Sequence, residues 1–439
     1  MFKLTKIAVL AGILAVTTTA TQAQFTEEDV KNSFYPYESY TPEFPGYTPG
    51  MKINQGNVDQ FKDILDPALY DHVKRGDVEL QTKATESLEL HPNYIKATMS
   101  AVNNPPTLSG DGLVDNFVAG RAFPAEPDVN DPQAGLKLAW NYQYGYNWGD
   151  NAAIKPFYWK FRSMKSGKVE RTIKWAFHFL NWKHRVNQAP VPEFEDNPGG
   201  LFRSIYLHAA EPFDIANTQV LIHRYKNDLK RDDAWLYLGF QRRVRRLATG
   251  QTTDAFLGTD IMIEDFEGYN NRVSDYDWTF VGTKNGLLPF HNHNDLALAT
   301  DMPPEPDGYQ YVDFGGKGGC YPETTWELRK VYELHGTPKD KNHPLSKRVM
   351  YLDAQTATIP RQAEFDRKGD LWKSFTICQA YPDKHMAKNK GTGVSIDDCF
   401  MMQDVQAQHC TTGQFKGQVD PSLNPVSKFT VQNLRKSGR

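Results

Sequence analysis

The chain has 439 residues, a formal net charge of −3 and an aromatic content of 13%. Its length exceeds one average domain, but the aromatic content favours one large β-rich body over several small ones. The weakly acidic balance argues against general nucleic-acid binding, which depends on Lys and Arg neutralising phosphates.

The N-terminus has the pattern of a secretory signal peptide. Lys3 and Lys6 precede the apolar run Ile7–Val16, and small residues follow it. That run is too short to span a bilayer. The sequence therefore predicts a signal peptide at residues 1–23 and a mature chain exported, most simply, to a bacterial periplasm.

Helices are expected near the front of the chain. Residues 24–53 are rich in Pro and Tyr and predict an extended arm, followed by a single domain over residues 54–439. Apolar residues at three-four spacing predict a helical stretch from Asn54 to Arg75, interrupted at Pro67. Two more helices are predicted, at Asn93–Val102 and from Ala134 to Tyr142.

Strand-like runs then recur to the C-terminus, separated by Gly, Asn, Asp and Pro turns. So many antiparallel strands with a few helices predict an α+β fold, a large curved antiparallel sheet wrapped over those helices. The predicted strands are Ile154–Arg162, Val169–Asn181, Leu201–Ala209, Thr218–Tyr225, Trp235–Phe240, Arg242–Leu247, Tyr276–Gly282, Trp326–Leu334, Arg348–Asp353, Ile359–Phe365 and Leu371–Ala380.

The segment Asp232–Phe266 has the clearest alternation. Trp235 and Tyr237 fall on one side of a predicted strand, and Ala234 and Leu236 fall on the other. We interpret the aromatic side as a binding wall for an apolar ligand with an anionic end. The wall would be edged by Arg242, Arg243, Arg245 and Arg246. These arginines would bind a lipid headgroup or an acidic partner, or form a solvated edge that prevents aggregation.

An acidic group follows the arginines. Asp260, Glu264 and Asp265 could work as a pair of acid–base carboxylates if burial separated their pKa values. The favoured reading is structural. Asp260 caps a turn, and Glu264 and Asp265 form salt bridges with the arginines of the preceding strand.

Four cysteines in an exported chain predict two disulfides. They are Cys320, Cys378, Cys399 and Cys410, without the CxxC pairs typical of zinc sites. Three pairings are possible. If Cys378 and Cys399 lie on neighbouring antiparallel strands, they would bond to each other and leave Cys320 with Cys410.

The motif PFHNHND offers the best argument for an enzyme. His291, His293 and Asp295 could present ligands to a metal ion, as in a metal-assisted hydrolase. No distant third histidine or carboxylate has an independent claim, so the favoured alternative is a polar loop with exposed histidines. No Ser-His-Asp elbow is visible, and we expect neither an enzyme nor a cofactor.

Two family resemblances add to this reading. Within Glu211–Phe266, the motifs DDAWLYLG, RRVRRL, FLGTD and EDF resemble bacterial outer-membrane lipoprotein-sorting proteins of the LolA/LolB type. Gly239 stands where those relatives commonly have proline, and Thr259 where they have serine. Longer stretches resemble exported proteins of domain-of-unknown-function family 1329 (DUF1329), at residues 120–124, 131–142, 318–356 and 366–373.

The resemblance implies an incomplete β-barrel closed on one side by helices and a role in the transport of lipid or other hydrophobic solutes. It also implies two partners, an RND-type inner-membrane exporter and an outer-membrane protein. The sequence therefore predicts a carrier that binds its ligand without chemical turnover. The alternatives are a hydrolase at the His291 loop and a scaffold subunit without a ligand.

Overall fold

The computed structural model describes residues 25–197, 199–247 and 252–438. The predicted signal peptide lies outside these residues. Within them, no helix combines the length and the apolar character needed to cross a membrane.

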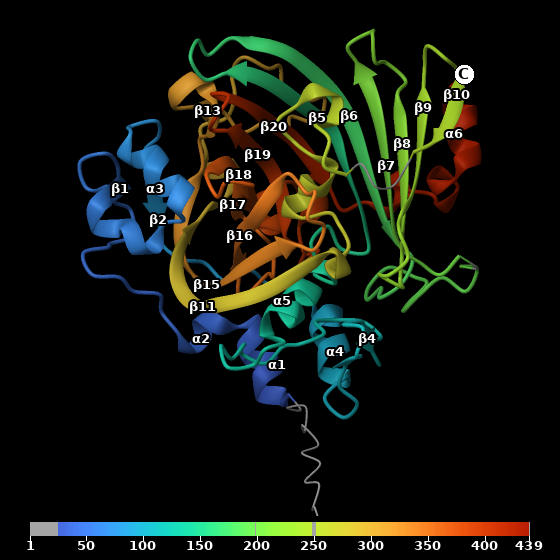
Figure 1. The fold of residues 1–439 in the computed structure, drawn as a ribbon, viewed down its shortest axis with the longest axis horizontal. Helices are drawn as coiled ribbons and strands as arrows, with labels where there is room; N and C mark the ends of the chain where they lie inside the picture. The colour runs from blue at the N-terminus through green and yellow to red at the C-terminus, as the bar shows by residue number, and fades with distance from the viewer. Residues whose placement is uncertain (1–24, 198, 248–251, 439) are drawn as a thin grey trace, which may run out of the picture.

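One sheet of 16 strands dominates the described part of the chain (Figure 1). Its main path runs β1, β2, β15 to β20 in order, and then β5 to β10, while β11 pairs with β15 and β12 with β18. The bounds are β1 Lys52–Ile53, β2 Leu80–Lys83, β5 Asn151–Ser163, β6 Val169–Asn181, β7 Leu201–Glu211, β8 Gln219–Tyr225, β9 Asp233–Leu238, β10 Arg243–Arg246, β11 Tyr276–Leu288, β12 Phe290–His291, β15 Thr325–Pro338, β16 Leu345–Asp353, β17 Arg361–Asp366, β18 Leu371–Ala380, β19 Ile396–Asp404 and β20 His409–Gln418.

The sheet is curved and open. Its strands bend around the centre of the molecule in Figure 1, from β1 and β2 on one side to β10 on the other. Neighbours are antiparallel except for the pairs β2–β15 and β12–β18. Two short ladders stand apart, β3 (Thr107–Leu108) with β4 (Val114–Asp115) and β13 (Phe314–Gly315) with β14 (Tyr321–Pro322). The predicted α+β architecture, an incomplete barrel with few helices, is confirmed.

The predicted strands are all present, and β6 and β18 have the predicted bounds. Strands β19 and β20 were not predicted. Nearly every residue of both strands is buried on either face, so their sequences lack the apolar–polar alternation of a half-exposed strand. Their Asp, Gly and Gln residues further resemble turn composition.

The N-terminal segment is helical where an extended arm was predicted. Helix α1 (Glu27–Phe34) begins with a capping box, in which Thr26 Oγ1 accepts from the Asp29 amide at 3.1 Å and Asp29 accepts from the Thr26 amide at 2.7 Å. Helix α2 (Pro36–Ser39) follows directly. Pro36 occupies the first helical position, where proline is compatible with a helix. Residues 40–51, which contain the other prolines, form turns and irregular chain, so only the first half of the predicted arm is helical.

The other predicted helices are confirmed, although the first is split. A 3-10 helix, η1 (Val58–Ile64), precedes α3 (Pro67–Lys74), which begins at the N-cap Asp66. Helices α4 (Pro92–Ser100) and α5 (Ala134–Gln143) lie with α1 at one end of the molecule in Figure 1. Helix α6 (Val431–Ser437) packs against β8, β9 and β10.

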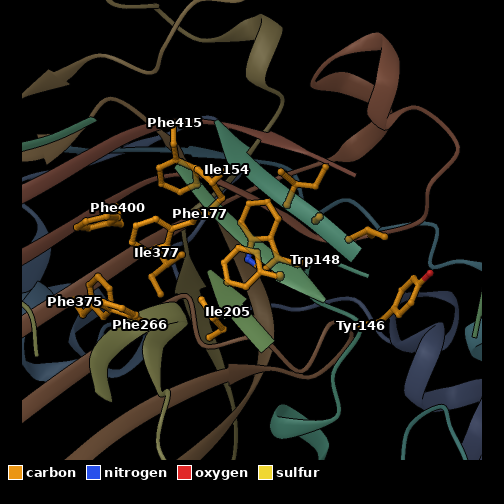
Figure 2. Close-up of a cluster of buried hydrophobic side chains, with 14 of the residues drawn as sticks. Tyr146, Trp148, Ile154, Phe177, Ile205, Phe266, Phe375, Ile377, Phe400 and Phe415 are labelled. Atoms are coloured by element: carbon orange, nitrogen blue, oxygen red, sulfur yellow. The ribbon is translucent and has the colours of Figure 1, made fainter. Parts of the chain in front are cut away.

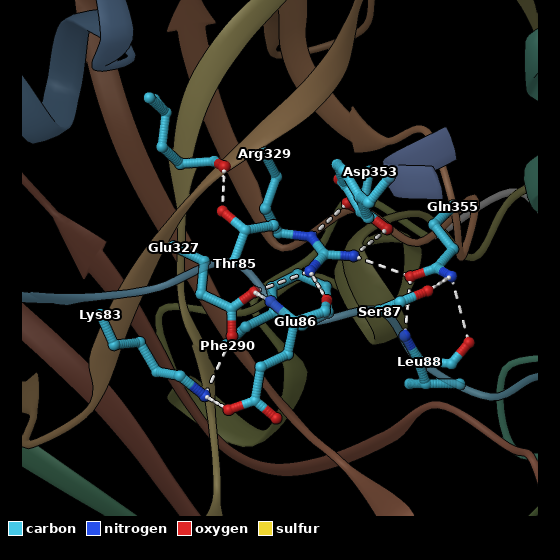
Figure 3. A network of polar contacts seen from close by, with 12 residues as sticks. Lys83, Thr85, Glu86, Ser87, Leu88, Phe290, Glu327, Arg329, Asp353 and Gln355 are labelled. Carbon is cyan, nitrogen blue, oxygen red and sulfur yellow. Dashed lines mark hydrogen bonds and ion pairs between the residues drawn. The ribbon is translucent and has the colours of Figure 1, made fainter. Parts of the chain in front are cut away.

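A buried polar network around Arg329 joins the N-terminal segment to the sheet (Figure 3). The guanidinium bonds Asp353 Oδ1 through Nε at 2.6 Å and Glu327 Oε2 through an Nη at 2.7 Å. Glu327 also pairs with Lys83 at 3.2 Å. Gln355 accepts from Arg329 at 3.1 Å and donates to the Phe34 carbonyl at the end of α1. One buried cation thereby connects α1, β2, β15 and the end of β16.

One of the two predicted disulfides is present. Cys320 and Cys410 are bonded and connect the segment before β14 to β20. Cys378 and Cys399 lie opposite each other on β18 and β19, as the prediction required, but both are free thiols. Directly opposed residues hold their Cβ atoms about 4.5–5.5 Å apart, whereas a disulfide needs about 3.8 Å. Opposed positions in the register therefore do not by themselves bring two sulfur atoms to bonding distance.

Candidate functional site

A groove of about 530 Å³ opens beside β8 and β9. Its floor is aliphatic, because Val220 and Ile222 of β8 and Ala234 and Leu236 of β9 face it. The register pairs Val220 with Leu236 and Ile222 with Ala234. Since directly opposed residues share a face of the sheet, these four side chains form one continuous apolar surface. The volume lies within the range of small-molecule sites.

The opposite wall comes from distant parts of the chain. The segment after residue 251 contributes Phe256, Leu257 and Ile263, and the turn between β15 and β16 contributes Pro338 and His343. Leu257 is 38% exposed, a large fraction for such a side chain. The groove therefore presents apolar side chains on both walls and opens to solvent at its rim.

The rim carries charges of both signs. Asp232 and Asp275 are already paired, with Arg224 at 2.7 Å and with Arg272. Arg231 is exposed and has no ion pair within the described residues. The remaining rim charges are Lys339, Asp254 and Asp340. The rim of the groove therefore differs from the arginine edge predicted from the sequence, which carries positive charge alone.

Behind the groove lies a second buried guanidinium, Arg348. It contacts Glu264, Asp265 Oδ1 at 2.8 Å and Glu364 Oε1 at 2.7 Å. His343, which lines the groove, approaches Glu264 Oε1 at 3.0 Å. Burial alone would raise the pKa of Glu264, but Arg348 and His343 outweigh it and lower that pKa to about 2. Burial, reinforced by Asp265 and opposed by Arg348, raises the pKa of Glu364 to about 8.

The prediction that Glu264 and Asp265 form salt bridges with the arginines of β10 is therefore wrong. Glu264 and Asp265 are fully buried against Arg348, not paired with the arginines of β10, because their 3-10 turn folds back into the sheet. Asp260 instead accepts from Thr411 Oγ1 at 2.7 Å and contacts His409 at 2.8 Å.

Aromatic side chains fill the interior of the curved sheet. Figure 2 shows Phe266 reaching towards Phe375 and the strand residues Phe177 and Ile377. The cavity left there is about 50 Å³, far below the volume of a ligand site. Its polar end contains Asp397, whose pKa burial and the nearby Glu267 raise to about 8.

One segment separates this interior from the groove. Ile261 and Phe266 line the interior cavity, while Leu257 and Ile263 line the groove. Phe256 lies between the two, because it lines the groove and its ring contacts Trp159 and Phe266, which line the interior cavity. It also stacks on Trp175, with ring centroids 5.7 Å apart. The helices predicted to cover the concave face reach only part of it, since α1 and α4 contribute side chains to the main core but not to either cavity.

The aromatic face of β9, predicted as a binding wall, is covered by the C-terminus. Tyr237 is 2% exposed and donates to the Gly438 carbonyl at 2.6 Å. Trp235 packs in the same cluster, beside His223 and near Phe429. The alternation was read correctly, but the open face of the strand is the aliphatic one.

The predicted arginine edge is exposed. Arg242, Arg243, Arg245 and Arg246 lie in or beside β10, the last strand of the sheet path. Arg242 and Arg243 line a surface cavity with Arg435 of α6, and Arg246 pairs with Asp233. Arg245 lies opposite Leu236 in the register, at the margin of the groove floor.

The two histidines of PFHNHND are buried rather than exposed. His291 and His293 meet Asp398 of β19, a carboxylate more than 100 positions away that the sequence did not single out. Asp295 does not join them; it is exposed and accepts from Asn292 at 3.0 Å. The motif contained no sign of Asp398, since only the pairing of the strands brings it close.

Comparison with known proteins then decides the family. The sequence model described as a protein of unknown function, DUF1329, matches residues 52–435. The chain belongs to the DUF1329 family. The family predicted from the sequence is therefore confirmed. No curated protein matches the chain significantly.

Solved structures similar to this DUF1329 protein carry related descriptions. A DUF1329 family protein from Desulfovibrio piger is 17% identical with a TM-score of 0.47, covering 70% of this chain and all of the other. A putative outer membrane lipoprotein-sorting protein domain from Vibrio parahaemolyticus is 18% identical with a TM-score of 0.46 and the same coverage. A LolA superfamily protein from Nitrosomonas europaea is 10% identical with a TM-score of 0.37, covering 65% of this chain and 91% of the other.

Proposed function

We propose that this DUF1329 protein is a periplasmic carrier for a lipid-like amphiphile. The observation that supports the proposal most directly is the groove, with its continuous aliphatic floor of Val220, Ile222, Ala234 and Leu236 and its mixed-charge rim. The apolar part of the ligand would lie on the floor and its polar head among the rim charges. Each CH2 group removed from water contributes about 0.8 kcal/mol, which is enough to hold a long chain without a covalent bond.

The segment around Phe256 offers a way to enlarge the site. A ligand that displaced Phe256 from Trp175 would extend from the groove towards the interior cavity behind it. The proposed mechanism is binding and release, without turnover. The finer points of the proposal are export by the N-terminal signal and cooperation with an RND-type exporter and an outer-membrane protein. The Cys320–Cys410 disulfide supports an oxidising compartment.

The test compares two carboxylate insertions in the full chain. Leu236→Asp places a charge on the groove floor, whereas Phe213→Asp places the same charge on a side chain that is 98% exposed and outside the groove. A fluorescent fatty acid titrated into each protein should lose about tenfold or more in affinity for Leu236→Asp only, because burying a charge opposes binding. Equal affinity for both variants and the wild type would remove the groove from the proposal.

Native mass spectrometry after gentle extraction identifies the cargo. A co-purifying amphiphile whose occupancy falls in Leu236→Asp supports the carrier. A bare mass, with no binding of added fatty acid, phospholipid or lysophospholipid, would favour a scaffold subunit instead.

A further inference from the structure

The segment from Phe290 to Tyr321 begins with β12, which pairs with β18, and then runs against the outer face of the sheet. Val312 packs on Cys378 and Cys399, whereas the adjacent residue Ile377 faces the interior cavity. Gln414 of β20 donates to the Val312 carbonyl at 2.7 Å, and Tyr309 donates to the Phe415 carbonyl at 2.8 Å. We call residues 290–321 the outer strap.

Two histidines of the outer strap converge on a single carboxylate of the sheet. His291 Nε2 lies 2.9 Å and His293 Nδ1 lies 2.7 Å from the same oxygen, Asp398 Oδ2. Asp398 occupies a bulge of β19, because Cys399 pairs with Cys378 and Asp397 pairs with Gln379, leaving Asp398 without a partner on β18. Such bulges re-aim a side chain. This one directs Asp398 to the histidines.

The remaining ring nitrogens are held by other groups. His293 Nε2 lies 3.0 Å from the Gln310 carbonyl, to which it can only donate. In the neutral ring its Nδ1 then carries no proton, yet this nitrogen faces a carboxylate oxygen. Two electron-rich atoms at that separation need a second proton or a cation between them. His291 Nδ1 is held in turn by Thr324 Oγ1 at 2.8 Å.

The Asp398 carboxylate can accept more hydrogen bonds than it is given. Asp398 is fully buried, and its Oδ1 has no hydrogen-bond partner among the described residues. Buried carboxylate oxygens are normally satisfied, so an orphan in this position calls for an explanation such as an ion. The ligand atoms of His291, His293 and Asp398 all lie within 4.8 Å of one another.

We propose that His291 Nε2, His293 Nδ1 and the Asp398 carboxylate bind a divalent metal ion, with Zn²⁺ as the best fit. Imidazole nitrogens and carboxylate oxygens are zinc ligands. The bonds to Gln310 and Thr324 are the outer-shell contacts that fix histidine orientation in such sites. His385 lies beside the cluster, since its Nε2 lies 3.3 Å from the Tyr309 hydroxyl and 3.9 Å from Asp398 Oδ2, and Asn389 donates to its Nδ1 at 3.0 Å.

The site would be structural. Each of the three ligand residues is at most 2% exposed, so a substrate has no access to the ion. Binding would fasten the start of the outer strap to β19, while the Cys320–Cys410 disulfide fastens its end to β20. This inference concerns residues that do not line the groove, so it stands or falls independently of the proposed carrier function.

The experiment uses the purified full chain, stripped with a chelator and titrated with Zn²⁺ alone. Wild type should bind one zinc per chain and melt at a higher temperature with zinc than without it. His293→Gln and Asp398→Asn should weaken binding by about tenfold or more. His335→Gln is the matched control, because His335 bonds Glu333 outside the cluster; it should bind zinc as the wild type does. Equal binding by His293→Gln and His335→Gln would overturn the proposal.

X-ray absorption on wild type keeps the test decisive if a variant fails to fold. A first shell of nitrogen and oxygen at about 2.0–2.2 Å supports the site. A sulfur shell at about 2.3 Å would place the metal on Cys378 and Cys399 and overturn the assignment. Failure of the folded wild type to bind zinc would overturn it as well.

Discussion

Arg329 and Arg348 are buried and each contacts more than one carboxylate, but the charges around them differ. Arg329 contacts Glu327 and Asp353, Lys83 pairs with Glu327 and Glu86, and Lys384 pairs with Glu86, so three cations face three carboxylates. Arg348 faces three carboxylates, Glu264, Asp265 and Glu364, with His343 beside the first. The charges around Arg329 balance. Around Arg348 the carboxylates outnumber the cations, so this centre becomes neutral only when it takes up protons.

The two centres also differ in where they lie relative to the groove. The Arg329 centre fastens α1 to the sheet and sits away from the groove. The Arg348 centre lies directly behind the groove wall, since His343 and Tyr276 belong to the wall and both contact its members. Charge balance therefore distinguishes the Arg329 centre from the acid-rich Arg348 centre behind the groove wall.

The largest expected effect comes from breaking the balanced centre. Arg329→Met leaves Glu327 and Asp353 buried without their guanidinium, which costs about 3–5 kcal/mol. Urea unfolding at neutral pH should show this loss. Arg243→Met, at an exposed position, is the control and should unfold with the wild type. A loss for Arg329→Met as small as that of the control would show that the network is not needed for stability.

The acid-rich centre should make stability depend on pH. The pKa of Glu364 is about 8 in the folded protein against an ordinary value of 4.5. Its contribution is therefore complete below pH 4.5, declines as pH rises and is lost above pH 8. The decline amounts to up to about 1.4 kcal/mol per pH unit. Glu364→Gln should flatten this slope in urea unfolding measured across that range. An unchanged slope would mean that another group titrates.

Removing one cation should convert the charge-balanced Arg329 centre into one with an excess of carboxylates. Lys83→Met removes one of its three cations, leaving Arg329 and Lys384 to balance three carboxylates. We expect a loss of about 1–3 kcal/mol at neutral pH, together with a new decline of stability with rising pH. If Lys83→Met is destabilised equally at all pH values, Lys83 contributes packing and not charge.

A smaller effect is expected where Phe256 separates the groove from the interior. Phe256→Ala removes its stacking on Trp175 and its ring contacts with Trp159 and Phe266, and should open space between the groove and the interior cavity. The variant should bind longer acyl chains relatively better than short ones, by about 0.8 kcal/mol for each additional buried CH2. Chain-length series measured by fluorescent-probe displacement would show this. Parallel series for variant and wild type would exclude the interior as ligand space.

The smallest effect is expected at the sheet edge. Arg246 pairs with Asp233 at the surface, where solvent screens the interaction. Arg246→Ala should leave the unfolding midpoint within experimental scatter. A clear shift would show that the β10 edge is more strongly held than its exposure indicates.

The sequence predicted those features of the strands that depend on residues close together in the chain. The bounds of β6 and β18 followed from strand-like runs between turn residues, and the two faces of β9 followed from period-two spacing. Which face of β9 stays open did not follow, because α6, almost 200 residues later, covers the aromatic side. Long-range pairing also decides the partners of Glu264 and of the His291 motif. Arg348 and Asp398 reach them through sheet register, which no local spacing encodes.

The junction of β20 with β5 also has a consequence for how the chain folds. These strands pair Thr411 with Phe161, so the two halves of the sheet path meet only when the C-terminal strand is in place. Contacts over such sequence separations carry a high closure entropy and form slowly. A chain still emerging from its ribosome lacks β20 and cannot complete the sheet. Until β20 is in place, β19 and β5 each lack a neighbour on the side that β20 occupies.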